Sequence, residues 1–156
     1  MTITNEANLI HAGLSELQQL AGSTSEAKGF HDDHPRREDF VAGERGDLVF
    51  KRAMGHYQGN LMMLIVSEAV EAHDEIRTGH AADQTYYPTI NAMPGSYDPV
   101  YAVGKHKPEG VPSEIADGVI RAFDYAYRNN FSLADIIIEK ITFNQSRERM
   151  HGGKAF

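Results

Sequence analysis

The sequence predicts an all-α protein, a bundle of about four main helices, on two observations. Apolar residues recur every three to four positions in four stretches, near residues 5–20, 47–77, 112–130 and 132–150, which is the period of an amphipathic helix. No stretch alternates apolar and polar residues convincingly, as a half-buried strand would. A chain of 156 residues can bury a core of its own, so we expect a single domain over residues 1–156.

The first helix is expected over residues 5–20, with an exit at Gly22. Its apolar members are Leu9, Leu14, Leu17 and Leu20. The polar stretch 23–44 is predicted to be mostly loop, because glycine and proline interrupt it. His31 and His34 in this stretch could form a metal pair, but no third ligand is evident. We therefore favour an exposed loop.

The second helix is expected to begin at Asp47 as N-cap and to end before Gly79, and it could bend near two internal glycines. On a helical wheel, Glu68 falls inside the apolar stripe, whereas Glu71 and Glu75 fall at its edge. The stripe consists of Leu61, Leu64, Ile65, Ala69, Ala72 and Ile76. The wheel therefore directs these acids toward the packed interior or its margin.

Residues 78–112 lose the helical pattern and are expected to form a long insertion between two acidic helices. Five of the six prolines lie here, and connections of this length usually have a functional role or are mobile. The segment also contains four tyrosines, Tyr86, Tyr87, Tyr97 and Tyr101. They could form a lid, a base-stacking surface or the cover of a core.

Local capping signals define the third and fourth helices. Ser113 is the expected N-cap of the third helix, which should end at Asn129 and Asn130, residues that tolerate the left-handed conformation. Ser132 is the expected N-cap of the fourth, with Asp135 three residues later in a position like that of a capping box. This helix should run to about residue 150.

Two acidic motifs are the main functional signal. Glu68-x-x-Glu71 and Glu114-x-x-Asp117 each place two carboxylates on one side of a helix. Four carboxylates facing one another would repel strongly unless a cation lay between them, and their hard oxygens suit Mg²⁺ or Mn²⁺. Glu114 and Asp117 could also simply stabilise the positive end of their helix dipole. That alternative is weaker for Glu68, which lies in an apolar face.

The fourth helix carries a different pattern. Lys140, Asn144 and Arg147 are spaced by four and three residues and share one face. Two cations and an amide in line would suit a polyphosphate. The alternative is a solvated basic strip.

Composition excludes several classes of function. The formal charge of −7 disfavours a nucleic-acid partner, because contacts to its phosphates need clustered Lys and Arg. The chain has no cysteine, which excludes disulfides, thiolate metal sites and cysteine nucleophiles. The longest apolar run, residues 61–66, is too short to span a membrane. No signal-peptide pattern is visible, so the cytoplasm is the expected compartment, that of the host if the protein is phage-encoded.

The order of these motifs, followed by His151-Gly152-Gly153-Lys154, resembles the MazG-like family of all-α nucleoside triphosphate pyrophosphohydrolases. Residues 64–77 and 112–156 resemble that family nearly throughout, and the segment 28–30 is similar to its N-terminal region. The spacer of residues 72–113 is longer than is usual in the family. This difference leaves the substrate and the subunit contacts open.

The resemblance implies Mg²⁺-dependent cleavage of a nucleoside triphosphate to the monophosphate and pyrophosphate. It implies metal binding by the four acids of the two motifs, Glu68, Glu71, Glu114 and Asp117, and phosphate contacts by Lys140, Asn144 and Arg147. Glu71 or Glu75 would accept the proton from water, and Lys140 and Arg147 would neutralise developing charge. The nucleobase of the substrate would lie among Phe30, Asn60 and the insertion tyrosines. Some phage-encoded members favour guanine nucleotides, including dGTP.

Three other functions stay open at this point: a helical protein-interaction module, a nucleotide-binding regulator without turnover, and a phosphohydrolase acting on monophosphates or phosphoesters. The wide apolar faces of the helices exceed what one small bundle easily buries. We therefore expect a homodimer or homotetramer, in agreement with what the resemblance implies.

Overall fold

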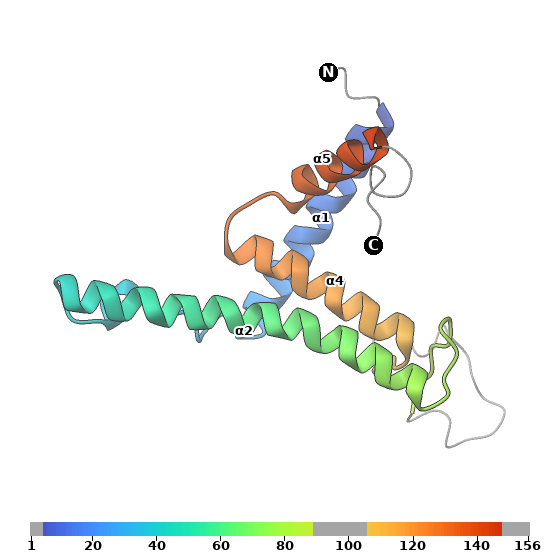
Figure 1. Ribbon diagram of the computed structural model, residues 1–156, viewed down its shortest axis with the longest axis horizontal. Coiled ribbons are helices and arrows are strands. Elements are labelled where there is room, and N and C mark those ends of the chain that lie inside the picture. The colour runs from blue at the N-terminus through green and yellow to red at the C-terminus, as the bar shows by residue number, and fades with distance from the viewer. Residues whose placement is uncertain (1–4, 89–105, 148–156) are drawn as a thin grey trace. The chain divides into compact units, whose positions relative to one another are not determined.

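The computed structural model describes residues 5–88 and 106–147. These residues form four α-helices and one short 3₁₀ helix, with no strand among them, which confirms the all-α class (Figure 1). The chain divides into two compact units, one of Met1–Asp32 and Phe123–Phe156 and the other of Asp33–Ala122. The single domain over residues 1–156 stays a prediction.

The first unit contains α1 (Asn5–Ala27), the end of α4 (Val111–Arg128) and α5 (Leu133–Ser146). Helix α1 continues through Gly22 to Ala27, so the predicted exit at Gly22 was wrong. A Cβ atom at Gly22 would overlap the side chain of Tyr127. Glycine is present because α4 approaches closely at this point, and the position carries no helix-ending signal.

The predicted leucine stripe of α1 is not its buried face. Leu9 and Leu20 are 74% and 64% exposed, whereas Gln18 is buried. The Gln18 amide donates a hydrogen bond to the carbonyl of Phe131 (2.8 Å) and accepts one from the Leu133 N–H (3.0 Å). A polar side chain therefore ties α1 to the turn between α4 and α5.

The capping signals around that turn are confirmed. Asn130 has φ 53° just after the end of α4. The Ser132 hydroxyl accepts a hydrogen bond from the Asp135 N–H (3.2 Å) at the start of α5. The expected end of this helix near residue 150 lies outside the described residues, and Ser146 is its last described helical residue.

The two histidines of residues 23–44 are both partly buried, so the exposed loop expected there was wrong for them. His31 Nε2 lies 2.8 Å from Asp124 Oδ1, and the Arg128 Nε donates to the other oxygen of that carboxylate at 2.9 Å. In the second unit, the ring of His34 stacks on that of Tyr57 with centroids 5.1 Å apart. Each histidine therefore has a structural contact of its own.

The second unit is built on α2 (Glu44–Arg77), one continuous helix in Figure 1. Its N-cap is Gly43, so the predicted cap at Asp47 was wrong by one turn. Asp47 lies in the first turn, where a carboxylate favours the helix dipole. It accepts a hydrogen bond from Arg37 Nε at 2.8 Å, and Arg37 opens the 3₁₀ helix η1 (Arg37–Asp39).

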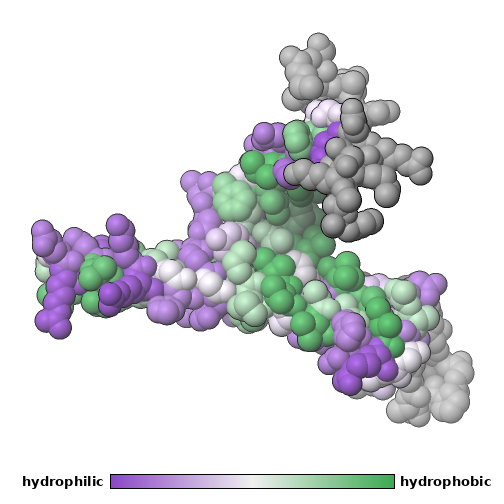
Figure 2. All heavy atoms as spheres, in the orientation of Figure 1, coloured by the Kyte–Doolittle hydropathy of each residue, from purple (hydrophilic) through white to green (hydrophobic). Residues whose placement is uncertain are grey.

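The helical wheel of residues 61–76 identified the buried acid Glu68 and one buried apolar residue, Ala72, whereas most of its other apolar members are not buried. Glu68 and Ala72 are buried on α2, as are Phe123 and Ala126 on α4. Of the other members of the predicted α2 stripe, Leu64, Ala69 and Ile76 are exposed. Figure 2 shows hydrophobic side chains at the surface over α2 and the first half of α4.

The insertion is closed at its base by an isolated β-bridge between Tyr86 and Glu109, with N–H to carbonyl distances of 3.1 and 2.9 Å. Gly110 follows with φ 103°, and a Cβ atom there would overlap the carbonyl of Gln84. Helix α4 starts directly afterwards. Ser113 lies in its first turn, where its hydroxyl donates to the Pro108 carbonyl (2.9 Å), so its predicted role as N-cap was wrong. Tyr97 and Tyr101 lie outside the described residues.

Candidate metal centre

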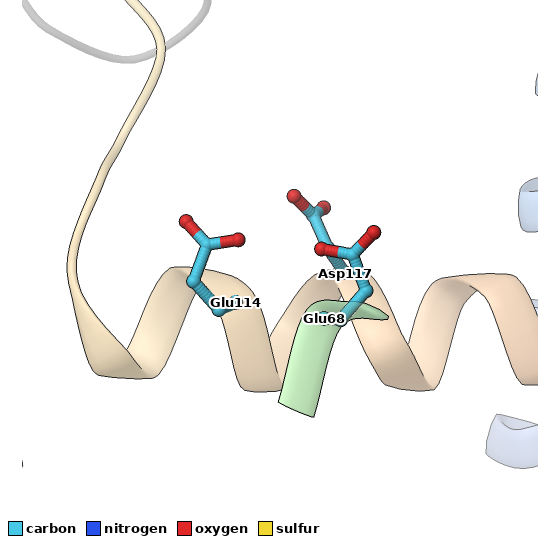
Figure 3. A group of neighbouring side chains, drawn as sticks. All are labelled: Glu68, Glu114 and Asp117. Atoms are coloured by element: carbon cyan, nitrogen blue, oxygen red, sulfur yellow. The ribbon is translucent and has the colours of Figure 1, made fainter. Parts of the chain in front are cut away.

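Three of the four predicted metal ligands come together in the second unit. Glu68 on α2 and the pair Glu114 and Asp117 on α4 each offer an oxygen, and these oxygens all lie within 4.8 Å of one another. Figure 3 shows the three carboxylates projecting to the same side of the two helices. In the described part of the chain, this is the one group of three acidic or histidine side chains so arranged. We call it the acidic triad.

Sequence spacing and one small residue produce this arrangement. Glu114 and Asp117 are three residues apart, so they lie on the same side of α4. Gly118 follows them, and a Cβ atom there would lie 3.5 Å from the Cβ of Glu68. The backbone of α4 therefore passes close to Glu68, which brings the carboxylates of the two helices together.

Two members of the triad are buried to an unusual degree for acids. Glu68 and Glu114 are each only 3% exposed, and Glu114 Oε2 has no hydrogen-bond partner among the described residues. Burial raises the pKa of Glu114, and the charges of Glu71, Asp117 and Glu109 raise it further, while Lys107 opposes them. Carboxylates in such surroundings are costly unless a cation compensates them.

The donor set fits a hard divalent cation. All the ligand atoms of the triad are carboxylate oxygens, and Mg²⁺ and Mn²⁺ prefer such ligands to nitrogen or sulfur. The unpartnered, buried oxygen of Glu114 is a further sign, because buried polar atoms are nearly always satisfied in folded proteins. The triad could therefore hold such a cation with its own side chains.

Two cations lie beside the triad, and the sequence alone assigned neither a role. Arg121 lies on α4, and its Nε forms an ion pair with Glu68 Oε1. Lys107 Nζ lies 3.1 Å from Glu109 Oε2, and the negative charges of Glu109, Glu114 and Asp117 help to raise the pKa of the lysine. Arg121 and Glu68 are 53 positions apart, so no local pattern could have paired them.

A second group of side chains surrounds Glu75 at the end of α2. The Tyr86 hydroxyl lies 3.3 Å from both oxygens of Glu75, and His80 Nδ1 lies 2.6 Å from one of them. Burial raises the pKa of Tyr86, as do the charges of Glu75, Glu109 and Glu114. Tyr86, the first tyrosine of the insertion, is thus hydrogen-bonded to Glu75, and the charge of the triad member Glu114 contributes to its raised pKa.

The remaining predicted site residues are placed less directly. Glu71 is exposed and is not part of the triad, although its charge acts on Glu114. Asn60 is also exposed, two turns before Glu68 on α2. The others belong to the first unit: Phe30, Lys140, Asn144 and Arg147.

These first-unit residues are exposed, and Phe30 is 67% exposed. Lys140 Nζ and the Arg147 guanidinium both lie over the ring of Phe143, at 5.8 and 5.9 Å from its centroid. The two cations therefore approach one aromatic side chain of α5, as residues on neighbouring turns of a helix face can. Their contact with a phosphate stays a prediction.

No protein-family model matches the chain, and neither a curated protein nor a solved structure matches it. The resemblance to the MazG-like family accordingly stays a prediction that depends on the motifs and on the acidic triad. Among the described residues, none of the helices has the length and apolar character of a membrane span.

Proposed function

We propose that this chain is a metal-dependent nucleoside triphosphate pyrophosphohydrolase of the MazG-like type, which converts a (d)NTP and water to the (d)NMP and pyrophosphate. One observation carries the proposal: Glu68 and Glu114 on two different helices are buried beside Asp117, and one oxygen of Glu114 is unpartnered. Solvated surface acids would not be arranged in this way. The type of reaction is inferred from the order of the motifs along the chain, which resembles that of the MazG-like family.

Each group of side chains has a different role in the proposed reaction. Glu68, Glu114 and Asp117 would hold Mg²⁺ or Mn²⁺, with Glu71 contributing its negative charge nearby. Such an ion polarises phosphate oxygens and lowers the pKa of water. Glu71, or Glu75 with the Tyr86 hydroxyl 3.3 Å from its carboxylate oxygens, would accept the proton from the attacking water. The resemblance to the MazG-like family implies phosphate contacts by Lys140, Asn144 and Arg147, and nucleobase contacts by Phe30, Asn60 and the insertion tyrosines are a further part of the proposal.

The direct test is a substrate panel. Purified protein with Mg²⁺ is expected to convert nucleoside triphosphates to the monophosphate and pyrophosphate, and dGTP and GTP are the first candidates. Separation of the products by ion-exchange chromatography identifies the bond that is broken. Diphosphate and orthophosphate as products would contradict the assigned bond, and turnover of monophosphates alone would favour a phosphohydrolase.

An interaction module is the second candidate, and the large exposed apolar side chains favour it. Calorimetric titration with Mg²⁺ and a nucleotide separates the possibilities. A module without a site gives no heat of binding for either ligand. A regulator that binds but has lost turnover gives heat without product.

We also propose that the chain forms a homodimer or homotetramer through α2 and α4. The exposed apolar residues on these helices are Met62, Met63, Leu64, Val66, Val70, Ile115, Val119 and Ile120. Light scattering after gel filtration is expected to give a multiple of the single-chain mass. Met63→Asp should reduce that mass, whereas Val41→Asp, at a residue that is 82% exposed and outside the helices, should not. A wild-type protein of single-chain mass would contradict this proposal.

A further inference from the structure

We infer that Arg121 is an internal counter-cation of the acidic triad, which a divalent cation must displace from Glu68 in order to bind. This inference rests on the metal site of the proposed function and adds a competitor within the chain. It concerns the metal-free protein, in which the buried carboxylates need compensation from the chain itself.

Arg121 is paired with Glu68 in this structure, but its exposure would allow it to leave the carboxylate. Arg121 lies one turn after Asp117 on α4, and its Nε binds Glu68 Oε1. The side chain of Glu68 is only 4% exposed, whereas that of Arg121 is 42% exposed. A buried carboxylate loses stability when its partner is removed. The half-exposed arginine can instead turn its head group into water on its long stem.

The compensation is unequal across the triad. Glu68 has its ion pair with Arg121, but Glu114 keeps one buried oxygen without a hydrogen bond. Lys107 is bound to Glu109 and acts on Glu114 only through its charge. The chain thus supplies a direct partner for one of the two buried acids.

Arginine and a divalent cation would compete for this site. The triad oxygens lie within 4.8 Å of one another, and Arg121 is paired with the Glu68 carboxylate, so an ion bound among these oxygens would be close to the guanidinium. Like charges at such short range repel, more strongly where the site is partly shielded from water. Entry of the ion therefore requires the guanidinium to leave Glu68.

The test is calorimetric titration of Mn²⁺ into the full chain without nucleotide. Arg121→Gln removes the competing charge and should tighten Mn²⁺ binding by roughly five- to tenfold, the scale of a partly exposed ion pair. Arg121→Lys keeps the charge and should stay within about twofold of wild type. Arg52→Gln is the matched control, because this exposed arginine lies 16 residues before Glu68 on α2, about 24 Å along the helix.

Thermal unfolding supplies the second measurement. In chelator, Arg121→Gln should unfold at a temperature about 2–4 °C lower than wild type, and saturating Mn²⁺ should abolish that difference. If Arg121→Gln binds Mn²⁺ no more tightly than wild type, or more weakly, Arg121 supports the site and the inference is wrong. If Arg121→Gln does not fold in chelator, Arg121→Lys decides, since tenfold weaker or tighter binding by that variant contradicts a role based on charge. A wild-type protein that binds no Mn²⁺ instead contradicts the metal site of the proposed function.

Discussion

Glu68→Gln is expected to lower the turnover of nucleoside triphosphates by on the order of a thousandfold or more. Glu68 is the member of the acidic triad that α2 contributes, and it is buried. The amide keeps the size of the side chain but loses the negative charge that would bind a divalent cation. Initial rates of pyrophosphate release at saturating Mg²⁺ measure the effect.

Helicity should be unchanged in this variant, because glutamine and glutamate have similar helix propensities. Far-ultraviolet circular dichroism checks this. Glu16→Gln is the matched control, since Glu16 is an exposed acid of α1 in the other compact unit. Full activity of Glu68→Gln would show that the triad is not the metal site, even if the chain hydrolyses nucleotides.

Glu114→Gln is expected to make the metal-free protein more stable while it abolishes the stabilisation by Mn²⁺. The cause is the burial of a carboxylate that is 3% exposed and has one unpartnered oxygen. Relief of even about 1 kcal/mol of this cost should raise the melting temperature in chelator by about 2–4 °C. Saturating Mn²⁺ should raise the melting temperature of wild type but leave that of the variant unchanged.

The stability that Glu114→Gln gains over wild type in the metal-free state should increase as the pH rises. Burial raises the pKa of Glu114 above its ordinary value of 4.5, so the folded chain binds this proton more tightly than the unfolded chain does. The free energy of unfolding of wild type therefore falls, relative to that of the variant, as the pH rises through the folded pKa. Near about pH 4 the carboxyl is largely protonated in both states, and the two proteins should converge.

Glu139→Gln on α5 is the control for this comparison, because that residue is exposed and belongs to the other unit. It should change neither the melting temperature in chelator nor the response to Mn²⁺. A Glu114→Gln variant that is less stable than wild type at neutral pH would mean that the charged form is compensated. The buried carboxylate of Glu114 would then not need a cation to compensate it, which would contradict the main reason for a cation site.

Local signals in the sequence were sufficient at the turn between α4 and α5, although the caps predicted from local signals at Asp47 and Ser113 were wrong. Ser132 caps α5 through Asp135, and Asn130 adopts the left-handed conformation after α4, as expected. The wheel placed Glu68 on the inside of α2, and the spacing of Glu114 and Asp117 placed both on one side of α4. Helix period and capping chemistry are properties of a few adjacent residues, so the sequence displays them directly.

The sequence was misleading where packing between distant segments decides. Gly22 looks like the end of a helix, but it is a contact with Tyr127, and no residue near it in the sequence indicates that. Leu64 and Ile76 belong to the predicted apolar stripe of α2 and are nevertheless exposed. An amphipathic pattern indicates which side of a helix is apolar, but it does not indicate which other surface, if any, covers that side. For the same reason, the pairing of Arg121 with Glu68 could not be foreseen.

The β-bridge at the base of the insertion has a consequence for how this protein can vary. Tyr86 and Glu109 fix the point at which the chain returns to α4, whatever number of residues lies between them. Closure of a longer loop costs little additional entropy. Relatives of this chain could therefore gain or lose residues beyond the bridge without shifting the register of Glu114 and Asp117 against Glu68. A change in the number of residues between Tyr86 and Glu109 would leave these three carboxylates in place.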